Sequence, residues 1–578
     1  MSSFCSTQPP DKAQAQLEPS DSGHALSPRW HRTGGWQRRL TTWWIVGIVC
    51  ALILGIAGGL APVAYAQDID AAEPSLVQNS PPPSTQEARQ EAETGDRSTN
   101  MQPYIDQAMG QITEFTLDNG MTFIVMERHQ APVISFMTYV NVGGVDEEEG
   151  KTGAAHYLEH LAFKGTQDIG TKDYGAEAEQ FAILDRLFDR IQQARADGDE
   201  ETLKELQEEF DAAQAKASSY VIQNQYALIV DQAGGVGLNA TTSADATRYF
   251  YSFPSNKLEL WMSVESERFL DPVFREFYEE KAVILEERRM RVDNSPVGKM
   301  VEEFLATAYQ EHPYRRPIIG YETDLQAMTR QDIQEFFDRY YTPNHMIFSV
   351  VGDVDPQRVK RLAEVYFSRY APGQTITRDL PDEPIQTEPR EVVLELPSQP
   401  WYFEGYHMPS VEDPDYLVHQ VITSILANGR TSRLYQSLVE KQQVALNAQC
   451  FSDFPGNRYG NLMVLYALTA PGHSVEEVEG AIATELERLR TELVSTEELD
   501  RVKTQWRASI LQTLDSNRGM ASLLPEYEAK TGSWQNLFEE LKQIEAIEPE
   551  DVLRVAQFTF SPEKRTVGKI LSESSSES

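Results

Sequence analysis

Residues 156–160 read His-Tyr-Leu-Glu-His, the pattern H-x-x-E-H, and this pentapeptide decides what kind of fold the chain is expected to have. On an α-helix, residues four apart lie one turn above each other on the same face. His156 and His160 can therefore reach one metal ion, with Glu159 beside it. Gly153 and Gly165 bracket a helix of suitable length. The pattern predicts a metal site with a carboxylate placed to take a proton from water.

A third metal ligand is expected farther along the chain, because catalytic zinc commonly takes two histidines and one carboxylate. The segment 277–289 is helical in character, and Val283 and Ile284 are expected to form its buried stripe. It contains two pairs of glutamates seven residues apart, which share a helix face: Glu280 with Glu287, and Glu279 with Glu286. The spacing does not choose between the pairs, and an acidic helix face exposed to solvent is the alternative interpretation.

Further motifs accompany the metal-site residues: Gly165-Thr166, the segment 237–243, His312-Pro313-Tyr314 and Tyr341-Thr342-Pro343-Asn344. With them the chain resembles the pitrilysin/insulinase family of zinc metallopeptidases, in particular its two-repeat bacterial and mitochondrial-processing-peptidase-like members. The resemblance covers about four-fifths of the chain, from near Gln111 to near Ile570. It implies that His156, His160 and Glu287 bind one Zn²⁺, that Glu159 is the general base, and that Glu280 orients a ligand histidine.

The same resemblance implies a zinc metalloendopeptidase that hydrolyses extended peptides or unfolded segments. Asn239, Ala240 and Thr241 precede a strand-like segment at 247–252. An exposed edge strand can pair with an extended peptide through its backbone, so these three residues are the predicted substrate-binding residues. A buried strand with a glycine-rich entry is the alternative for this segment. For the whole chain, the alternative function is a non-catalytic scaffold or assembly subunit on the same fold.

The chain departs from the family in the interval between His160 and Glu287, which is longer than usual. The excess lies at residues 176–225, where two stripes of apolar residues with helical spacing flank Asp197-Gly198-Asp199. These features predict an inserted helical hairpin. It serves either as a structural addition or as a lid or docking arm.

Internal repetition predicts two homologous domains. The motif Leu325-x-x-Met328 is echoed by Ile544-x-x-Ile547, and each copy is followed by an aspartate and then by a proline at the same spacing. The predicted domains are 108–372 and 388–570, with 373–387 as a linker and 571–578 as a disordered tail.

Each domain is expected to contain a mostly antiparallel sheet layered with helices, so the fold class is α+β. The second domain has no H-x-x-E-H, and Gln505 stands seven residues beyond Glu498. It is therefore expected to be catalytically inactive.

The first 66 residues predict a signal peptide or a membrane anchor. Arginines precede an apolar run at 43–60, and Ala64 and Ala66 are small residues at the positions read in a cleavage site. Export into a bacterial periplasm is the prediction, and a membrane tether formed by 43–60 is the alternative. Residues 67–107 are acidic and rich in Pro, Ser and Gln, which predicts a disordered linker.

The formal net charge of −38 argues against nucleic acid and anionic lipid as partners and favours basic peptides, with solubility as the simpler role. Cys5 and Cys50 lie in the leader, so a cleaved chain keeps only Cys450. Neither an internal disulfide nor a thiolate zinc site is then expected.

A partner chain is also predicted. Relatives of two-repeat length pair with a second chain, and many carry the pattern L-R-E-K-x-G-L-A-Y, whose Arg and Tyr contact the peptide near zinc. The corresponding stretch here is 438–446, with Val439 in the place of the Arg and Leu446 in the place of the Tyr. The expectation is a heterodimer with a related chain that supplies these groups, and a homodimer is the alternative.

Overall fold

The computed structural model describes residues 102–374 and 376–573. The predicted leader, including the apolar run 43–60, and most of the predicted linker and tail lie outside these residues. Leu571 and Ser572, which the sequence assigns to the disordered tail, instead end a strand, because they pair with Glu395 and Leu396. Residues 102–107, which the sequence assigns to the linker, belong to helix α3 (Gln102–Gly110), where Ile105 and Ala108 are buried. No helix within the described residues is both long and apolar enough to cross a membrane.

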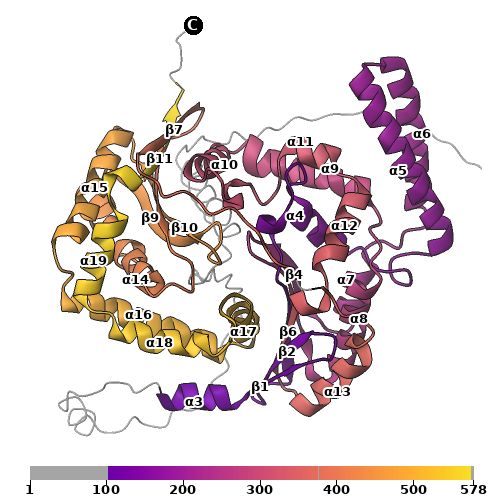
Figure 1. Ribbon diagram of the computed structural model, residues 1–578, viewed down its shortest axis with the longest axis horizontal. Coiled ribbons are helices and arrows are strands. Elements are labelled where there is room, and N and C mark those ends of the chain that lie inside the picture. Colours follow the sequence, from indigo (N-terminus) through magenta and orange to yellow (C-terminus); the bar gives the residue numbers. More distant parts are fainter. Residues whose placement is uncertain (1–101, 375, 574–578) are drawn as a thin grey trace, which may run out of the picture. The chain divides into compact units, whose positions relative to one another are not determined.

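The first domain is built on a six-stranded sheet with the order β1-β2-β6-β3-β5-β4 (Figure 1). Its strands are β1 (Ile112–Thr116), β2 (Thr122–Glu127), β3 (Val133–Val140), β4 (Val236–Thr242), β5 (Thr247–Pro254) and β6 (Met346–Gly352). Only β2 and β6 pair in parallel. Among the described strands, β4 has a neighbour on one side only, so its other edge is open for backbone pairing.

One face of this sheet forms the largest hydrophobic core with its helices. These helices are α4 (Ala154–Leu161), α7 (Gln225–Gln232), α8 (Leu258–Leu270), α9 (Phe277–Arg288), α12 (Arg330–Tyr340) and α13 (Pro356–Phe367). Phe123, Phe348 and Trp261 meet at its centre, with ring centroids of Phe123 and Phe348 separated by 4.9 Å. Burial of such aromatic side chains is a large part of the hydrophobic stabilisation.

The predicted helical hairpin is confirmed as α5 (Tyr174–Asp197) and α6 (Glu200–Ser218), which lie side by side (Figure 1). Gly198 adopts a left-handed φ of +70°, and the side chain of Asp199 caps α6 by accepting a hydrogen bond from the Thr202 backbone N–H. Leu184, Leu187, Ile191, Leu206 and Phe210 form the buried seam. The apolar stripes seen in the sequence are therefore the contact between the two helices.

The second domain has a five-stranded sheet with the order β7-β11-β8-β10-β9. Its strands are β7 (Arg390–Leu396), β8 (Trp401–Met408), β9 (Ala445–Phe454), β10 (Asn461–Thr469) and β11 (Thr566–Ser572). The parallel pair β7 and β11 matches β2 and β6, and the strands that follow in the order match as well. The structure thus confirms an α+β fold with two related, mostly antiparallel sheets.

Four helices pack on this second sheet: α14 (Tyr416–Ala427), α15 (Val475–Thr491), α16 (Thr496–Asp515) and α19 (Pro549–Thr559). Two more helices pack on the other face of the first sheet: α17 (Asn517–Thr531), and α18 (Asn536–Ala546), whose Ile544 also belongs to the core of the second domain. Met520 and Leu524 of α17 pack with Ile124 and Met137 on the sheet face opposite α4. The metal-site face and the α17 face of the first sheet are therefore distinct.

Candidate metal centre

Helix α4 carries the H-x-x-E-H residues and is fixed at its N-terminus by a buried carboxylate. The backbone N–H groups of Gly153 and Ala155 donate to Glu147, both at 2.9 Å. Burial raises the pKa of Glu147 to about 8, against the opposing effect of these two N–H groups. Gly153 adopts φ +88°, and a Cβ there would stand 2.7 Å from the carbonyl oxygen of Ile319. The turn that begins the metal helix therefore requires glycine.

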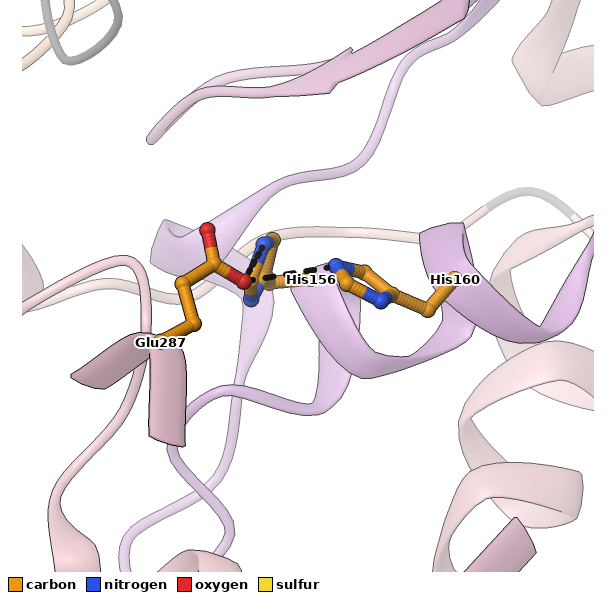
Figure 2. A group of neighbouring side chains, drawn as sticks. All are labelled: His156, His160 and Glu287. Carbon is orange, nitrogen blue, oxygen red and sulfur yellow. Dashed lines mark ion pairs between the residues drawn. The ribbon is translucent and has the colours of Figure 1, made fainter. Parts of the chain in front are cut away.

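Helix α9 brings Glu287 to both histidines. Glu287 Oε2 lies 3.7 Å from His156 Nε2 and 3.6 Å from His160 Nε2. Figure 2 shows its carboxylate reaching the two imidazoles from the neighbouring helix. Glu286, which the spacing alone left open, points to solvent and pairs with Arg289. Glu279 accepts a hydrogen bond from Ser218 Oγ at 3.0 Å.

The prediction that Val283 and Ile284 form the buried face of α9 is right for Ile284 and wrong for Val283. Ile284 is fully buried, but Val283 is 50% exposed. The buried face is instead formed by Phe277, Lys281, Ile284 and Arg288, at helical spacing. Lys281 lies on this face because its ammonium donates to the carbonyl oxygens of Gln326 and Met328, a long-range contact that the apolar pattern does not show.

The three side chains have the arrangement that zinc requires. Their ligand atoms lie within 4.8 Å of one another, and within the described parts of the chain they form the only such group of three or more. In a tetrahedral site with bonds of about 2.0–2.1 Å, ligand atoms stand about 3.3–3.4 Å apart, close to the His156–Glu287 and His160–Glu287 separations. Two histidines with one carboxylate leave a fourth position for water or substrate, so the residues fit a catalytic zinc ion.

The two histidines have different surroundings. Burial, with the charge of His160 next, lowers the pKa of His156 to about 3, so its imidazole is neutral and able to bind a metal. His160 Nδ1 is hydrogen-bonded to Glu280 Oε2 at 3.2 Å. Burial disfavours the charge on His160, but this bond and the nearby carboxylates outweigh it and raise its pKa. The structure therefore places Glu280 where it can fix the orientation of one imidazole.

Glu159 lies beside the group, and its contact with the sheet was not predicted. Thr242 Oγ1, at the end of β4, donates to Glu159 Oε2 at 2.6 Å. Burial raises the pKa of Glu159, while the bond from Thr242 opposes that change. Thr242 is within the family-like segment 237–243, but nothing in its spacing from Glu159 indicates that the two side chains meet.

The predicted substrate-binding residues lie on β4, the open edge strand. The segment 247–252, which was expected to form an edge strand, is instead part of β5, which pairs with β3 on one side and β4 on the other. Asn239 and Thr241 are exposed, whereas Ala240 packs into the core shared with α4. The strand ends at Thr242, against Glu159, so its edge leads directly to the metal group.

Two basic side chains that sequence reasoning missed hold the carboxylates. Arg291 Nη1 lies 2.9 Å from Glu287 Oε1, which leaves Oε2 toward the histidines. Lys164 contacts Glu280 and lies 3.0 Å from Glu276 Oε2. Each basic residue is close in sequence to a predicted ligand, and that proximity was the available signal.

Comparison with family models assigns the chain. The model described as Insulinase (Peptidase family M16) matches residues 123–184 and 213–322, and the Peptidase M16 inactive domain matches residues 327–506. The chain belongs to the M16 peptidase family. The M16 match leaves out residues 185–212, which lie within the α5–α6 hairpin.

Relatives of this M16 chain include zinc protease PqqE of Helicobacter pylori, 29% identical over 78% of this chain and 90% of the relative. The crystal structure of a protease from Helicobacter pylori matches with a TM-score of 0.67 and 27% identity, covering 80% of this chain and 99% of that one. The periplasmic protease PqqL from Escherichia coli shares the fold, with a TM-score of 0.60 and 18% identity. The match covers 80% of this chain and 47% of PqqL.

Proposed function

We propose that the chain is an exported zinc-dependent endopeptidase that hydrolyses peptide bonds in extended peptides or unfolded segments. The observation that carries the proposal is the convergence of His156, His160 and Glu287 on one point, with Glu159 beside it. Membership of the M16 family and the relative named as a zinc protease support the same chemistry.

In this proposal each group of residues has a separate role in the reaction. A zinc ion held by the three ligands supplies the Lewis acidity that polarises a peptide carbonyl and acidifies water. Glu159 takes a proton from the attacking water and delivers it to the departing amine. Because Thr242 donates to Oε2 of Glu159, Oε1 is the oxygen left to accept that proton. The open edge of β4 pairs with the peptide backbone and draws it along the strand to Thr242.

Metal removal and restoration test this function. The purified protein is stripped with a chelator, loaded with one equivalent of zinc, and assayed on a library of unstructured peptides at each stage. We expect one zinc per chain by elemental analysis, cleavage within peptides only when the metal is present, and full recovery on reloading. A folded, zinc-loaded sample that cleaves no peptide, alone or with a related chain, would contradict the proposal and favour the scaffold alternative.

We also propose a heterodimer with a related chain. Val439 lies in η6 (Tyr435–Lys441), partly buried, and Leu446 at the start of β9 is 49% exposed. Neither can donate a hydrogen bond to a substrate carbonyl, a contribution worth about 3–4 kcal/mol where one such donor is removed from a related type of site. The half-length match to PqqL is consistent with a second two-domain unit completing the enzyme.

The test of pairing is an assay of the isolated chain with and without each related chain encoded in the same cell. We expect weak cleavage alone and a large increase with a partner that carries the missing Arg and Tyr. Full activity of the isolated chain as a homodimer would overturn the heterodimer.

The export proposal rests on the arginines, the apolar run 43–60 and the small residues Ala64 and Ala66. One structural neighbour, PqqL, is described as periplasmic. N-terminal sequencing of the chain from its native cell should start near Gln67. An intact run 43–60 in a membrane fraction would identify a membrane tether instead.

A further inference from the structure

The two faces of strand β4 differ in what lies next to them. Ala240 and the partly buried Leu238 pack toward the core that contains α4, and Thr242 reaches Glu159 on the same face. The alternate residues Gly237, Asn239 and Thr241 are exposed. Asn239 pairs with Phe250 of β5, and Phe250 packs against the α17 core. Since paired residues share a sheet face, the exposed face of β4 is the one next to α17.

Arg518, the second residue of α17, stands at the far end of this exposed face. Its guanidinium lies 4.7 Å from the centre of the Phe250 ring, a cation–π arrangement that limits its freedom. Its Nη1 is 3.8 Å from the point where a side chain at Gly237 would begin. Arg518 is exposed, and in the part of the chain that the structure describes no carboxylate lies within ion-pair distance of it. Among the described residues, this positive charge at the open edge thus contacts the Phe250 ring and has no carboxylate partner.

We infer that Arg518 forms a binding subsite for a carboxylate on the substrate, supplied by an Asp or Glu side chain or by the peptide's C-terminus. This inference rests on the proposed peptidase function. A peptide paired with β4 points alternate side chains toward the α17 face. Arg518 binds one of these side chains where the peptide lies beside Gly237. The guanidinium suits this role because its planar N–H donors match the geometry of a carboxylate.

The subsite has a defined distance from the bond that is cut. Gly237 precedes Thr242 by five residues, and β4 has a register shift against β5 between Val236 and Asn239, so the two positions stand at most about 16 Å apart at about 3.3 Å per residue. The preferred carboxylate therefore lies four to six residues from the scissile bond. The strongly negative chain favours basic peptides as a whole, so an acidic preference at one position would be a local effect opposed to the general one.

The test uses peptides with one cleavable core and a single Glu, Gln or Lys placed three to seven residues from the scissile bond, on either side. A second series ends at the same positions in a free or an amidated C-terminus, which separates a side chain from a terminal carboxylate. With the zinc-loaded protein, or with its active complex, we expect kcat/KM to favour Glu over Lys by about five- to tenfold at one position. R518A should remove this preference and R518E should reverse it.

The matched control is R361E on α13, which makes the same charge change at another exposed arginine. It should retain the preference of the unaltered protein. If R518E keeps the acidic preference, or if R518E and R361E shift it equally, the subsite is wrong. Cleavage of the Gln peptides shows separately that the peptidase function holds, so failure of the subsite is distinguishable from failure of the proposed function.

Discussion

The two domains share the order of five strands but differ at the positions that carry the candidate metal ligands in the first domain. Lys281 of α9 donates to the carbonyls of Gln326 and Met328 at 3.1 and 2.5 Å. Lys503 of α16 donates to the carbonyls of Glu545 and Ile547, both at 2.8 Å. These carbonyls occupy matching positions in the repeated motif, so Lys281 and Lys503 are equivalent residues.

This equivalence aligns the rest of the two helices. Counting from the lysines, Val502 takes the place of Glu280 and Ser509 takes the place of Glu287. The sequence alone suggested Glu498 and Gln505 instead, but Glu498 forms a two-point ion pair with Arg433 at 3.0 and 2.7 Å. The second domain therefore has the equivalent packing lysine but neither carboxylate.

The largest effect should come from Glu159→Gln, which removes the proposed base; the second domain has no H-x-x-E-H motif to supply another. The amide keeps the shape of the side chain and can still accept the hydrogen bond from Thr242, but it cannot take a proton from water. We expect kcat to fall by about a thousandfold or more, with zinc retained at one per chain. Parallel peptide assays and elemental analysis measure the two quantities. Substantial activity in this variant would show that another group is the base.

The choice of glutamate on α9 is tested next, by Glu287→Gln against its neighbour Glu286→Gln. Glu287 lies against both histidines, whereas Glu286 pairs with Arg289 in solvent. We expect Glu287→Gln to weaken zinc binding by more than about a hundredfold, because altering even the residues that orient ligands costs about 10- to 100-fold. Glu286→Gln should bind zinc normally in a competition titration. The opposite ranking would mean that the wrong face of α9 had been assigned.

A smaller loss is expected from Thr242→Val, which removes a hydroxyl but keeps the shape of the side chain. Without the bond to Oε2, the Glu159 carboxylate loses both an orienting contact and an interaction that lowers its pKa. We expect kcat to fall about tenfold, with little change in zinc content or melting temperature. Thr116→Val, at an exposed threonine on β1 of the same sheet, is the control. Equal losses in both variants would show that the effect does not depend on the contact with Glu159.

Local patterns predicted the parts of this fold that depend on neighbours in sequence. The H-x-x-E-H helix, the hairpin α5–α6 and the repeated motif all follow from spacing within a short window. The contact of Thr242 with Glu159 and the burial of Lys281 depend on residues far apart in the chain. Helical periodicity could not choose Glu287 over Glu286, because both pairs of glutamates satisfy it. That choice is made by the packing of α9 against α4.

Equivalent changes at the two lysines should have similar effects on stability and different effects on activity. Lys281→Met and Lys503→Met each remove the ammonium donor from two backbone carbonyl oxygens, in one buried and one partly buried contact, which we expect to cost about 2–3 kcal/mol of unfolding free energy. Urea denaturation of both variants measures this cost. Lys281→Met should also weaken zinc binding, because α9 carries Glu287, whereas Lys503→Met should not. Equal loss of zinc in both variants would remove the distinction between the domains.

The smallest effect concerns a buried carboxyl group of the second domain that serves no metal. Burial raises the pKa of Glu540 to about 7, and its Oε2 accepts a hydrogen bond from Tyr527 Oη at 2.5 Å. In the unfolded chain this group ionises near pH 4.5. Between these values the folded protein holds a proton that the unfolded chain has lost, so the contribution of Glu540 to stability falls as pH rises through this window.

Glu540→Gln keeps an acceptor for Tyr527 but cannot ionise, so the fall in stability between pH 5 and pH 8 should shrink by about 1–2 kcal/mol. The rest of the slope should remain, because burial also raises the pKa of Asp453, to about 6. Urea denaturation across this range measures the change. Glu539→Gln, an exposed neighbour paired with Lys542, should leave the slope unaltered. An unchanged slope in Glu540→Gln would show that this carboxyl group is already ionised in the folded protein.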